Sequence, residues 1–171
     1  MEFIFSQAVS LFSVLLLGLS SLWVTPPASV PLSSIGTTTA QVVEVIDGDT
    51  IVVTLGTSTM RTKVRYIGID TPEPYAQKTP ECGSKEATNR NKELVENQVV
   101  TIVPGRDVYD TYGRLLAYVY VKSIFVNETL VREGYASVLM IKPNTQFKTS
   151  FADLYTYARI HQLGIWSVCD E

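Results

Sequence analysis

The sequence predicts a mainly β domain that also carries helices (α+β), built as a small OB-type barrel of five strands with three α-helices. Short stretches rich in β-branched residues, each bounded by turn-forming residues, predict the strands. Longer stretches with helical spacing of apolar residues predict the helices. A chain of 171 residues, 46% of them hydrophobic, is long enough for one such domain with its own core. An open α+β sheet is the alternative arrangement.

Turn-forming residues separate the expected strands. The sequence DGD at residues 47–49 follows the first strand, and residues 56–59 form a hairpin loop after the second. The sequence TPEP at residues 71–74 ends the third strand, because the residue before each proline is held out of the helical region. Residues 104–112 are expected to be a loop. The expected strands are residues 41–46, 50–55, 61–69, 98–103 and 114–122.

Capping and stop residues mark the expected helices. Ser84 is a suitable N-cap for the first helix, and Asn127 is expected to cap the short second one. Gly164 follows the third helix and is expected to end it. The expected helices are residues 84–97, 127–134 and 149–163.

The N-terminal residues are predicted to lie outside the domain. No charged residue occurs from Phe3 to Val43, and residues 8–24 are predominantly apolar. We expect residues 1–24 to be a signal peptide or, alternatively, an N-terminal membrane anchor, followed by a flexible Pro-, Ser- and Thr-rich linker at residues 25–40. The domain at residues 41–171 is therefore expected to be secreted, periplasmic or extracellular, or tethered to a membrane outside the cytoplasm.

Composition narrows the chemistry that the domain can perform. One His and two Cys are too few for a four-ligand zinc site without carboxylates. A net charge of −3 argues against a large basic patch of the kind that binds nucleic acid non-specifically. The 17 Asp and Glu residues are left as the main candidates for hard-cation or acid–base chemistry.

Three short segments collect the charged residues that such chemistry needs. Asp47 and Asp49 flank a glycine between the first two expected strands, which suits a hard cation with oxygen ligands. Arg65 precedes residues 70–73 (DTPE), and residues 110–114 (DTYGR) form a turn that ends in an arginine. Each segment alone is typical of an ordinary turn or surface cation. Together they supply carboxylates for a divalent cation and a base, and guanidinium groups for a phosphate, as phosphodiester hydrolysis requires.

Six motifs, in the same order along the chain, resemble the thermonuclease family of staphylococcal-nuclease-like domains. The resemblance covers about residues 41–168 and implies an OB-type five-stranded barrel with three helices. It also implies a calcium-dependent, sugar-non-specific endonuclease that hydrolyses DNA and RNA, prefers single strands, acts as a monomer and leaves 3′-phosphate ends. The motifs are VIDGDTIVV, RYIGIDTPE, DTYGRLLAYVY, NETLVREGYA, KPNT and IWS.

The resemblance implies a calcium site at the first two of these motifs. Asp49 and Asp70 would bind Ca²⁺ through their side chains, and Thr71 through its backbone carbonyl. Asp47 would order the surroundings of the ion without being a firm direct ligand.

The resemblance also implies roles in the reaction. Glu73 would be the general base or the carboxylate that orients the attacking water. Arg65 and Arg114 would clamp the scissile phosphate, and Tyr112 would donate a hydrogen bond to a nucleotide phosphate.

The chain departs from the family pattern at some substrate-binding positions. A loop lysine before the phosphate-binding tyrosine is Thr111 here, and two tyrosines before the KPNT motif are Leu139 and Ile141. One of those tyrosines stacks on a base, and such stacking is worth about 1–3 kcal/mol. We therefore expect weaker nucleotide binding.

A non-catalytic OB-type module that binds nucleic acid or protein is the alternative function. Such modules usually lose one or more of the metal-site acids or phosphate-clamp arginines. This chain retains the set, which favours the enzyme.

The cysteines, Cys82 and Cys169, are expected to pair if the protein is exported. The alternative is two free thiols.

Overall fold

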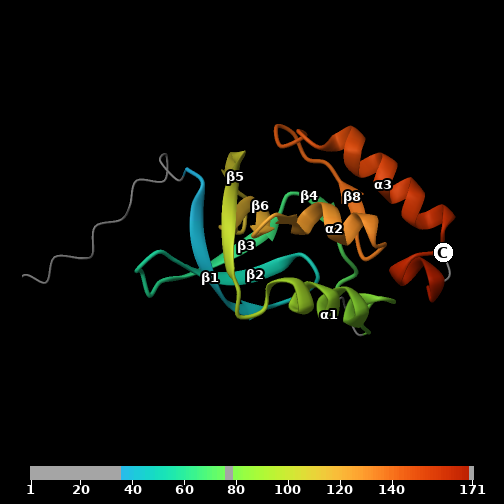
Figure 1. Cartoon of the computed structure of the whole chain (residues 1–171), viewed down its shortest axis with the longest axis horizontal. Coiled ribbons are helices and arrows are strands. Elements are labelled where there is room, and N and C mark those ends of the chain that lie inside the picture. Colours follow the sequence, from blue (N-terminus) through green and yellow to red (C-terminus); the bar gives the residue numbers. More distant parts are fainter. Residues whose placement is uncertain (1–35, 76–78, 170–171) are drawn as a thin grey trace, which may run out of the picture. The chain divides into compact units, whose positions relative to one another are not determined.

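The computed structural model describes residues 36–75 and 79–169 (Figure 1). The expected signal peptide or membrane anchor at residues 1–24, and residues 25–35 of the expected linker, lie outside the described residues. Within the described ranges, no helix is long and apolar enough to cross a membrane.

Five strands form a closed barrel, as the sequence predicts for an OB-type fold. They are β1 (Thr38–Val45), β2 (Thr50–Leu55), β3 (Arg61–Tyr66), β5 (Val99–Tyr109) and β6 (Leu115–Val121). Neighbouring strands pair in antiparallel fashion in the order β3-β2-β1-β5-β6, and parallel pairing between β3 and β6 closes the ring. Together with three α-helices, this confirms the predicted α+β barrel and excludes the open sheet.

The core fills the barrel and extends to the helices α2 (Val126–Arg132) and α3 (Lys148–Ile160), which lie side by side in Figure 1. Val64 and Leu115, which are register partners in the closing pair of strands, are both fully buried. Phe151 of α3 is also fully buried and belongs to the same apolar cluster. The strands that close the barrel are thus held by packing as well as by backbone hydrogen bonds.

A small second sheet accompanies the barrel and was not expected from the sequence. It pairs β4 (Gly68–Asp70) with β8 (Ser137–Leu139) in antiparallel fashion. Strand β4 is the end of the segment predicted as one strand over residues 61–69. The segment divides because Gly68 adopts a left-handed conformation (φ 85°), which turns the chain. This turn sets the direction in which Asp70 leaves the sheet.

Strand β5 is longer than predicted. It continues to Tyr109, through a segment that the sequence predicts as a loop beginning at Pro104. Proline has no N–H for a strand ladder, and for that reason the expected strand ended before it. In the structure Pro104 still pairs with Ala117, and the register with β6 shifts between Pro104 and Tyr109. This irregularity accommodates the proline within a continuing strand.

Two helices have a different N-cap residue from the one predicted. Helix α1 (Ser84–Val95) has Gly83 at its N-cap, with φ 81°, so that Ser84 is its first residue. Helix α2 has Phe125 at its N-cap. Asn127 instead lies inside α2, where its fully buried side chain bonds to the barrel. The Asn127 side chain, which the sequence predicts to cap its own helix, instead makes a tertiary contact.

A disulfide joins Cys82, just before α1, to Cys169, which follows the short 3₁₀ helix η2 (Gly164–Ser167). The two Cα atoms are 5.8 Å apart, and the two cysteines are 87 positions apart in the sequence. In the chain-entropy account, closing a loop of this length stabilises the fold by about 4–5 kcal/mol.

Replacing Asn127 by alanine is expected to lower the free energy of unfolding by about 2–3 kcal/mol. The Asn127 Oδ1 accepts a hydrogen bond from the N–H of Val119 (2.9 Å), and its Nδ2 donates one to the carbonyl of Ile67 (2.9 Å). Both backbone groups would be left without this partner. Urea unfolding of the two proteins measures the difference. Asn89→Ala, at an exposed position of α1, is the control and should change stability by less than about 0.5 kcal/mol.

Candidate active site

Four carboxylates from two separate segments lie near one another. Asp47 and Asp49 occupy the turn between β1 and β2, Asp70 ends β4, and Glu73 follows in the next loop. Asp49 is fully buried, and its Oδ2 accepts hydrogen bonds from the Thr71 N–H (2.9 Å) and the Thr71 hydroxyl (3.1 Å). These bonds join the turn to the loop. We call Asp47, Asp49, Asp70 and Glu73 the carboxylate cluster.

Arg65 lies between two members of the carboxylate cluster. Its Nη1 is 2.5 Å from Asp49 Oδ2, and its Nη2 is 2.6 Å from Asp70 Oδ1. The same Nη1 donates a hydrogen bond to the carbonyl of Ile69 (3.0 Å). Only 10% of the Arg65 side chain is exposed, so the charges interact with little screening by water. The guanidinium therefore offsets part of the repulsion between the buried and half-buried acids.

The turn that carries Asp47 is fixed by contacts that sequence reasoning missed. A Cβ at Gly48 would lie 2.6 Å from Thr71 Oγ1, so this close approach of turn and loop requires glycine. Asn91 of α1 is fully buried, donates a hydrogen bond to the Asp47 carbonyl (2.9 Å) and accepts one from the Tyr66 hydroxyl (3.0 Å). A polar residue in the middle of the buried face of α1 was the signal that could have identified Asn91.

Glu73 is an exposed member of the carboxylate cluster, and Glu81 holds its backbone. The Glu73 N–H donates to Glu81 Oε2 (2.8 Å), and the Glu81 N–H donates to the Glu73 carbonyl (3.0 Å). Partial burial and the charge of Asp47 raise the pKa of Glu73, and Arg65 opposes this rise. Sequence reasoning did not identify Glu81, because two residues on either side of a loop carry no periodic pattern.

The carboxylate cluster has the chemistry of a hard-cation site. Burial raises the pKa of Asp49, Arg65 opposes the rise, and the charges of Asp47 and Asp70 add to it. A cation among these acids would relieve their repulsion, and carboxylate and carbonyl oxygens are the ligands that Ca²⁺ prefers. The Asp70 Oδ2 and the Thr71 carbonyl accept no hydrogen bond from a described residue, so both are available to such an ion.

The donors present fit the expected calcium ligands in kind, but they are few. Among the described residues, no group of three or more His, Cys, Asp or Glu side chains lies close enough together to hold a metal ion. As the expected ligands, Asp49, Asp70 and the carbonyl of Thr71 would supply two carboxylates and one neutral oxygen, and further ligands would be water or substrate oxygens.

The second arginine, Arg114, is held by Asp110 in the loop before β6. The carboxylate of Asp110 accepts hydrogen bonds from the N–H groups of Tyr112 and Arg114 (both 2.9 Å) and from Arg114 Nε (2.6 Å). The guanidinium carbon lies 5.4 Å from the centre of the Tyr112 ring, within range of a cation–π interaction. Sequence reasoning gave Asp110 no role. The available signal was an aspartate at the start of a tight turn, because an aspartate side chain there often accepts hydrogen bonds from backbone N–H groups of the same turn.

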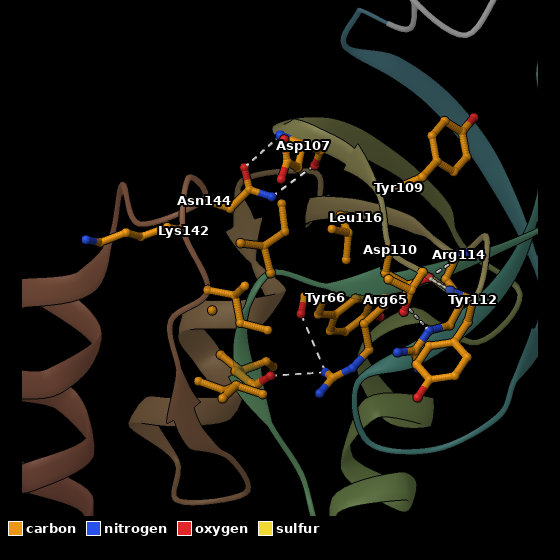
Figure 2. A pocket seen from close by; sticks show the side chains of 16 residues that line it. Arg65, Tyr66, Asp107, Tyr109, Asp110, Tyr112, Arg114, Leu116, Lys142 and Asn144 are labelled. Carbon is orange, nitrogen blue, oxygen red and sulfur yellow. Dashed lines mark hydrogen bonds and ion pairs between the residues drawn. The ribbon is translucent and has the colours of Figure 1, made fainter.

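A pocket of about 360 Å³ opens beside the two arginines (Figure 2). Arg65, Arg114 and Tyr112 lie at one end of it, whereas Lys142 points away on the opposite side. The pocket therefore combines an apolar wall with an end that carries two guanidinium groups and the carboxylate of Asp110, and the guanidinium groups suit an anionic group of a ligand whose apolar ring lies on the wall. The apolar side chains that line it are Ile67, Ile69, Leu116, Leu139 and Ile141.

The strand register explains why Arg65 and Arg114 meet. Strands β3 and β6 run parallel, with Val64 opposite Leu115 and Arg65 opposite Leu116. Arg114 immediately precedes β6, so it enters the pocket next to the strand that carries Arg65. Arg65 also contacts the carboxylate cluster, and it is therefore common to the pocket and the acids.

The chain is similar to one protein family and to several nucleases. Residues 63–168 match the family described as staphylococcal nuclease homologue. The chain is 35% identical over 143 residues to a thermonuclease of Staphylococcus hyicus, covering 83% of each protein. It is 37% identical over 123 residues to a thermonuclease of Staphylococcus intermedius, covering 71% of this chain and 72% of that one. It is 42% identical over 127 residues to the SPbeta prophage-derived endonuclease YokF of Bacillus subtilis, covering 71% of this chain but 42% of that protein.

Asp110→Asn is expected to lower the free energy of unfolding at pH 7 by about 1–2 kcal/mol, because the three hydrogen bonds to its carboxylate weaken or are lost. Burial would raise the pKa of Asp110, but hydrogen bonds from Arg114 and the Tyr112 N–H outweigh it and hold this pKa below its ordinary value. A carboxylate with a lowered pKa contributes stability above its unfolded pKa of about 3.9, and this stability is lost as the pH falls through the folded pKa.

The difference between wild type and Asp110→Asn should therefore shrink below about pH 4. Urea unfolding at a series of pH values from 7 to 3 measures it. Asp153→Asn, at an exposed position of α3, is the control and should run parallel to wild type. A difference of constant size across this range would contradict the assigned charge pairing of Asp110 and Arg114.

Proposed function

Because the chain belongs to the staphylococcal nuclease homologue family, we propose that it is a nuclease that hydrolyses the phosphodiester bonds of DNA and RNA. The observation that carries this proposal is the convergence of Arg65 and Arg114 at one end of a pocket, with Arg65 also contacting the carboxylate cluster. Two guanidinium groups beside carboxylates are the groups that hydrolysis of a phosphodiester needs. The relatives named thermonuclease and endonuclease support the same reaction class.

Arg65 and Arg114 would bind the scissile phosphate and offset the negative charge that develops on it in the transition state. Asp110 engages Arg114 through Nε, and no described residue accepts a hydrogen bond from either Nη of Arg114. Those two donors therefore remain available for phosphate oxygens. Tyr112 lies beside this guanidinium and is 84% exposed, so its hydroxyl can reach a neighbouring phosphate.

Glu73 would orient the attacking water and accept its proton. Its side chain is exposed, as contact with water requires, whereas its backbone is fixed by Glu81 and by the prolines on either side of it. The proton moves from the water to a Glu73 carboxylate oxygen as the new bond to phosphorus forms. Cleavage of the bond between phosphorus and the 5′ oxygen would release that oxygen, which takes up a proton from solvent to become a 5′ hydroxyl, and would leave a 3′-phosphate end.

Asp49, Asp70 and the Thr71 carbonyl would hold Ca²⁺, with Asp47 ordering its surroundings. When bound, the ion supplies positive charge to the phosphate oxygens and helps to lower the pKa of water. This assignment is supported by the repulsion among the acids and by the free oxygens of Asp70 and Thr71.

We also propose that the domain acts outside the cytoplasm, as a secreted protein or on a membrane tether, and as a monomer on single-stranded substrates. The Cys82–Cys169 disulfide supports this location, because structural disulfides persist mainly in oxidising compartments. The positions of Leu139 and Ile141 in the pocket wall support weak binding of individual bases.

The protein is expected to cut circular single-stranded DNA and RNA in the presence of calcium and to lose this activity when EGTA is in excess. A circular substrate has no ends, so its cleavage identifies an endonuclease. Mass spectrometry of the fragments should find 3′-phosphate ends. Binding without cleavage would support the non-catalytic module instead, and cleavage that persists in EGTA would contradict the calcium assignment.

Glu73→Gln and Arg114→Ala are each expected to lower kcat by about 100- to 10,000-fold, because one removes the base and the other a phosphate ligand. Glu96→Gln and Arg61→Ala, both exposed and outside the pocket and the carboxylate cluster, are the matched controls and should keep kcat within about twofold. Circular dichroism and urea unfolding establish that all four variants are folded. Near-normal rates for the first pair would show that the roles are misassigned.

A further inference from the structure

Two hydrogen bonds join Glu73 to Glu81. The Glu73 N–H donates to Glu81 Oε2 (2.8 Å), and the Glu81 N–H donates to the Glu73 carbonyl (3.0 Å). Both residues are exposed, and an exposed glutamate side chain loses considerable rotamer freedom when it is held in one geometry. The contact therefore needs support from the structure on the Glu81 side.

That support comes from the start of α1 and the C-terminal segment. The Ser84 N–H donates to the Glu81 carbonyl (3.1 Å). Gly83 is in the left-handed region (φ 81°), and a Cβ there would lie 2.5 Å from Ile165 Cγ2, so the chain is packed tightly against η2. Cys82, which directly follows Glu81, is bonded to Cys169 just beyond η2. The backbone of Glu81 is therefore adjacent to a residue that the disulfide holds in place.

We propose that Glu81 is a positioning residue for Glu73, and that the Cys82–Cys169 disulfide fixes Glu81 for this task. The inference rests on the proposed nuclease function, because it concerns the carboxylate that would receive the proton from water. Glu81 acts through the peptide N–H of Glu73 and touches neither the phosphate nor the water. The disulfide acts through Glu81, since it limits the movement of the neighbouring residue relative to α1.

The first test separates positioning from direct catalysis by Glu81. Glu81→Ala is expected to lower kcat by about 10- to 100-fold with KM changed by less than about twofold, because a misplaced reacting group slows the chemical step. Glu81→Gln keeps a side-chain oxygen that can accept the Glu73 N–H, and it should restore kcat to within about threefold of wild type. Glu86→Ala, an exposed glutamate in the first turn of α1, is the matched control for loss of one charge and should not change kcat.

The second test asks whether the disulfide acts through Glu81. A Cys82→Ser/Cys169→Ser variant is expected to lose about 3- to 10-fold in kcat, measured at a temperature where urea unfolding shows all variants to be folded. In the Glu81→Ala background, the same pair of substitutions should lower kcat by less than about twofold, because the contact that the disulfide supports is already absent. A merely structural disulfide would change the unfolding midpoint equally in both backgrounds and leave kcat unaffected in both.

The outcomes distinguish this inference from the proposed function. If wild type cleaves no nucleic acid, the proposed function fails. If wild type cleaves and Glu81→Ala has the wild-type kcat, positioning by Glu81 is wrong while the nuclease function stands. If Glu81→Gln is as slow as Glu81→Ala, the charge of Glu81 acts directly and the positioning role is again overturned. Multiplicative losses for Glu81→Ala and the cysteine pair would show that the disulfide does not work through Glu81.

Discussion

The arrangement of the site depends on the burial of one carboxylate, that of Asp49. A buried carboxylate is costly unless hydrogen bonds and an opposite charge compensate it. The compensation comes from the hydroxyl of the neighbouring Thr50 and from two places farther along the chain, the guanidinium of Arg65 on β3 and the N–H and hydroxyl of Thr71 after β4. Satisfying Asp49 therefore brings the β1–β2 turn, the barrel wall and the Glu73 loop to one point.

The barrel adds the second half of the site by a different means. Among the described residues, Arg114 and Arg65 share no acidic partner, and their proximity follows from the parallel register of β3 and β6. Asp110 then fixes the direction of Arg114 from within its own loop. One arginine is thus positioned by the acids it neutralises, and the other by a turn. Both arginines line the same pocket, and apolar side chains form its wall.

The secondary-structure segments could largely be predicted from the sequence, whereas several side chains whose role depends on tertiary contacts could not. The strand segments follow from β-branched runs between turns, and the closed barrel from their number and length. Asn127 has the sequence of a helix cap but bonds to the barrel, and Pro104 has the sequence of a strand end but lies within β5. Asn91 bonds to a residue distant in the chain, and its place on the buried face of α1 was the one signal for it; Glu81 bonds across a loop, where no periodicity points to a partner.

The disulfide has a topological consequence for the site. It closes residues 82–169 into a covalent ring that contains Arg114. Asp49 and Arg65 lie in the part of the chain before Cys82, outside this ring. Arg65 and Arg114, which line one end of the pocket, therefore belong to different topological parts of one molecule. Beyond the continuous backbone, pairing of β3 with β6, of β1 with β5 and of β4 with β8 holds the two parts together, and the β3–β6 pairing is the one that keeps Arg65 beside Arg114.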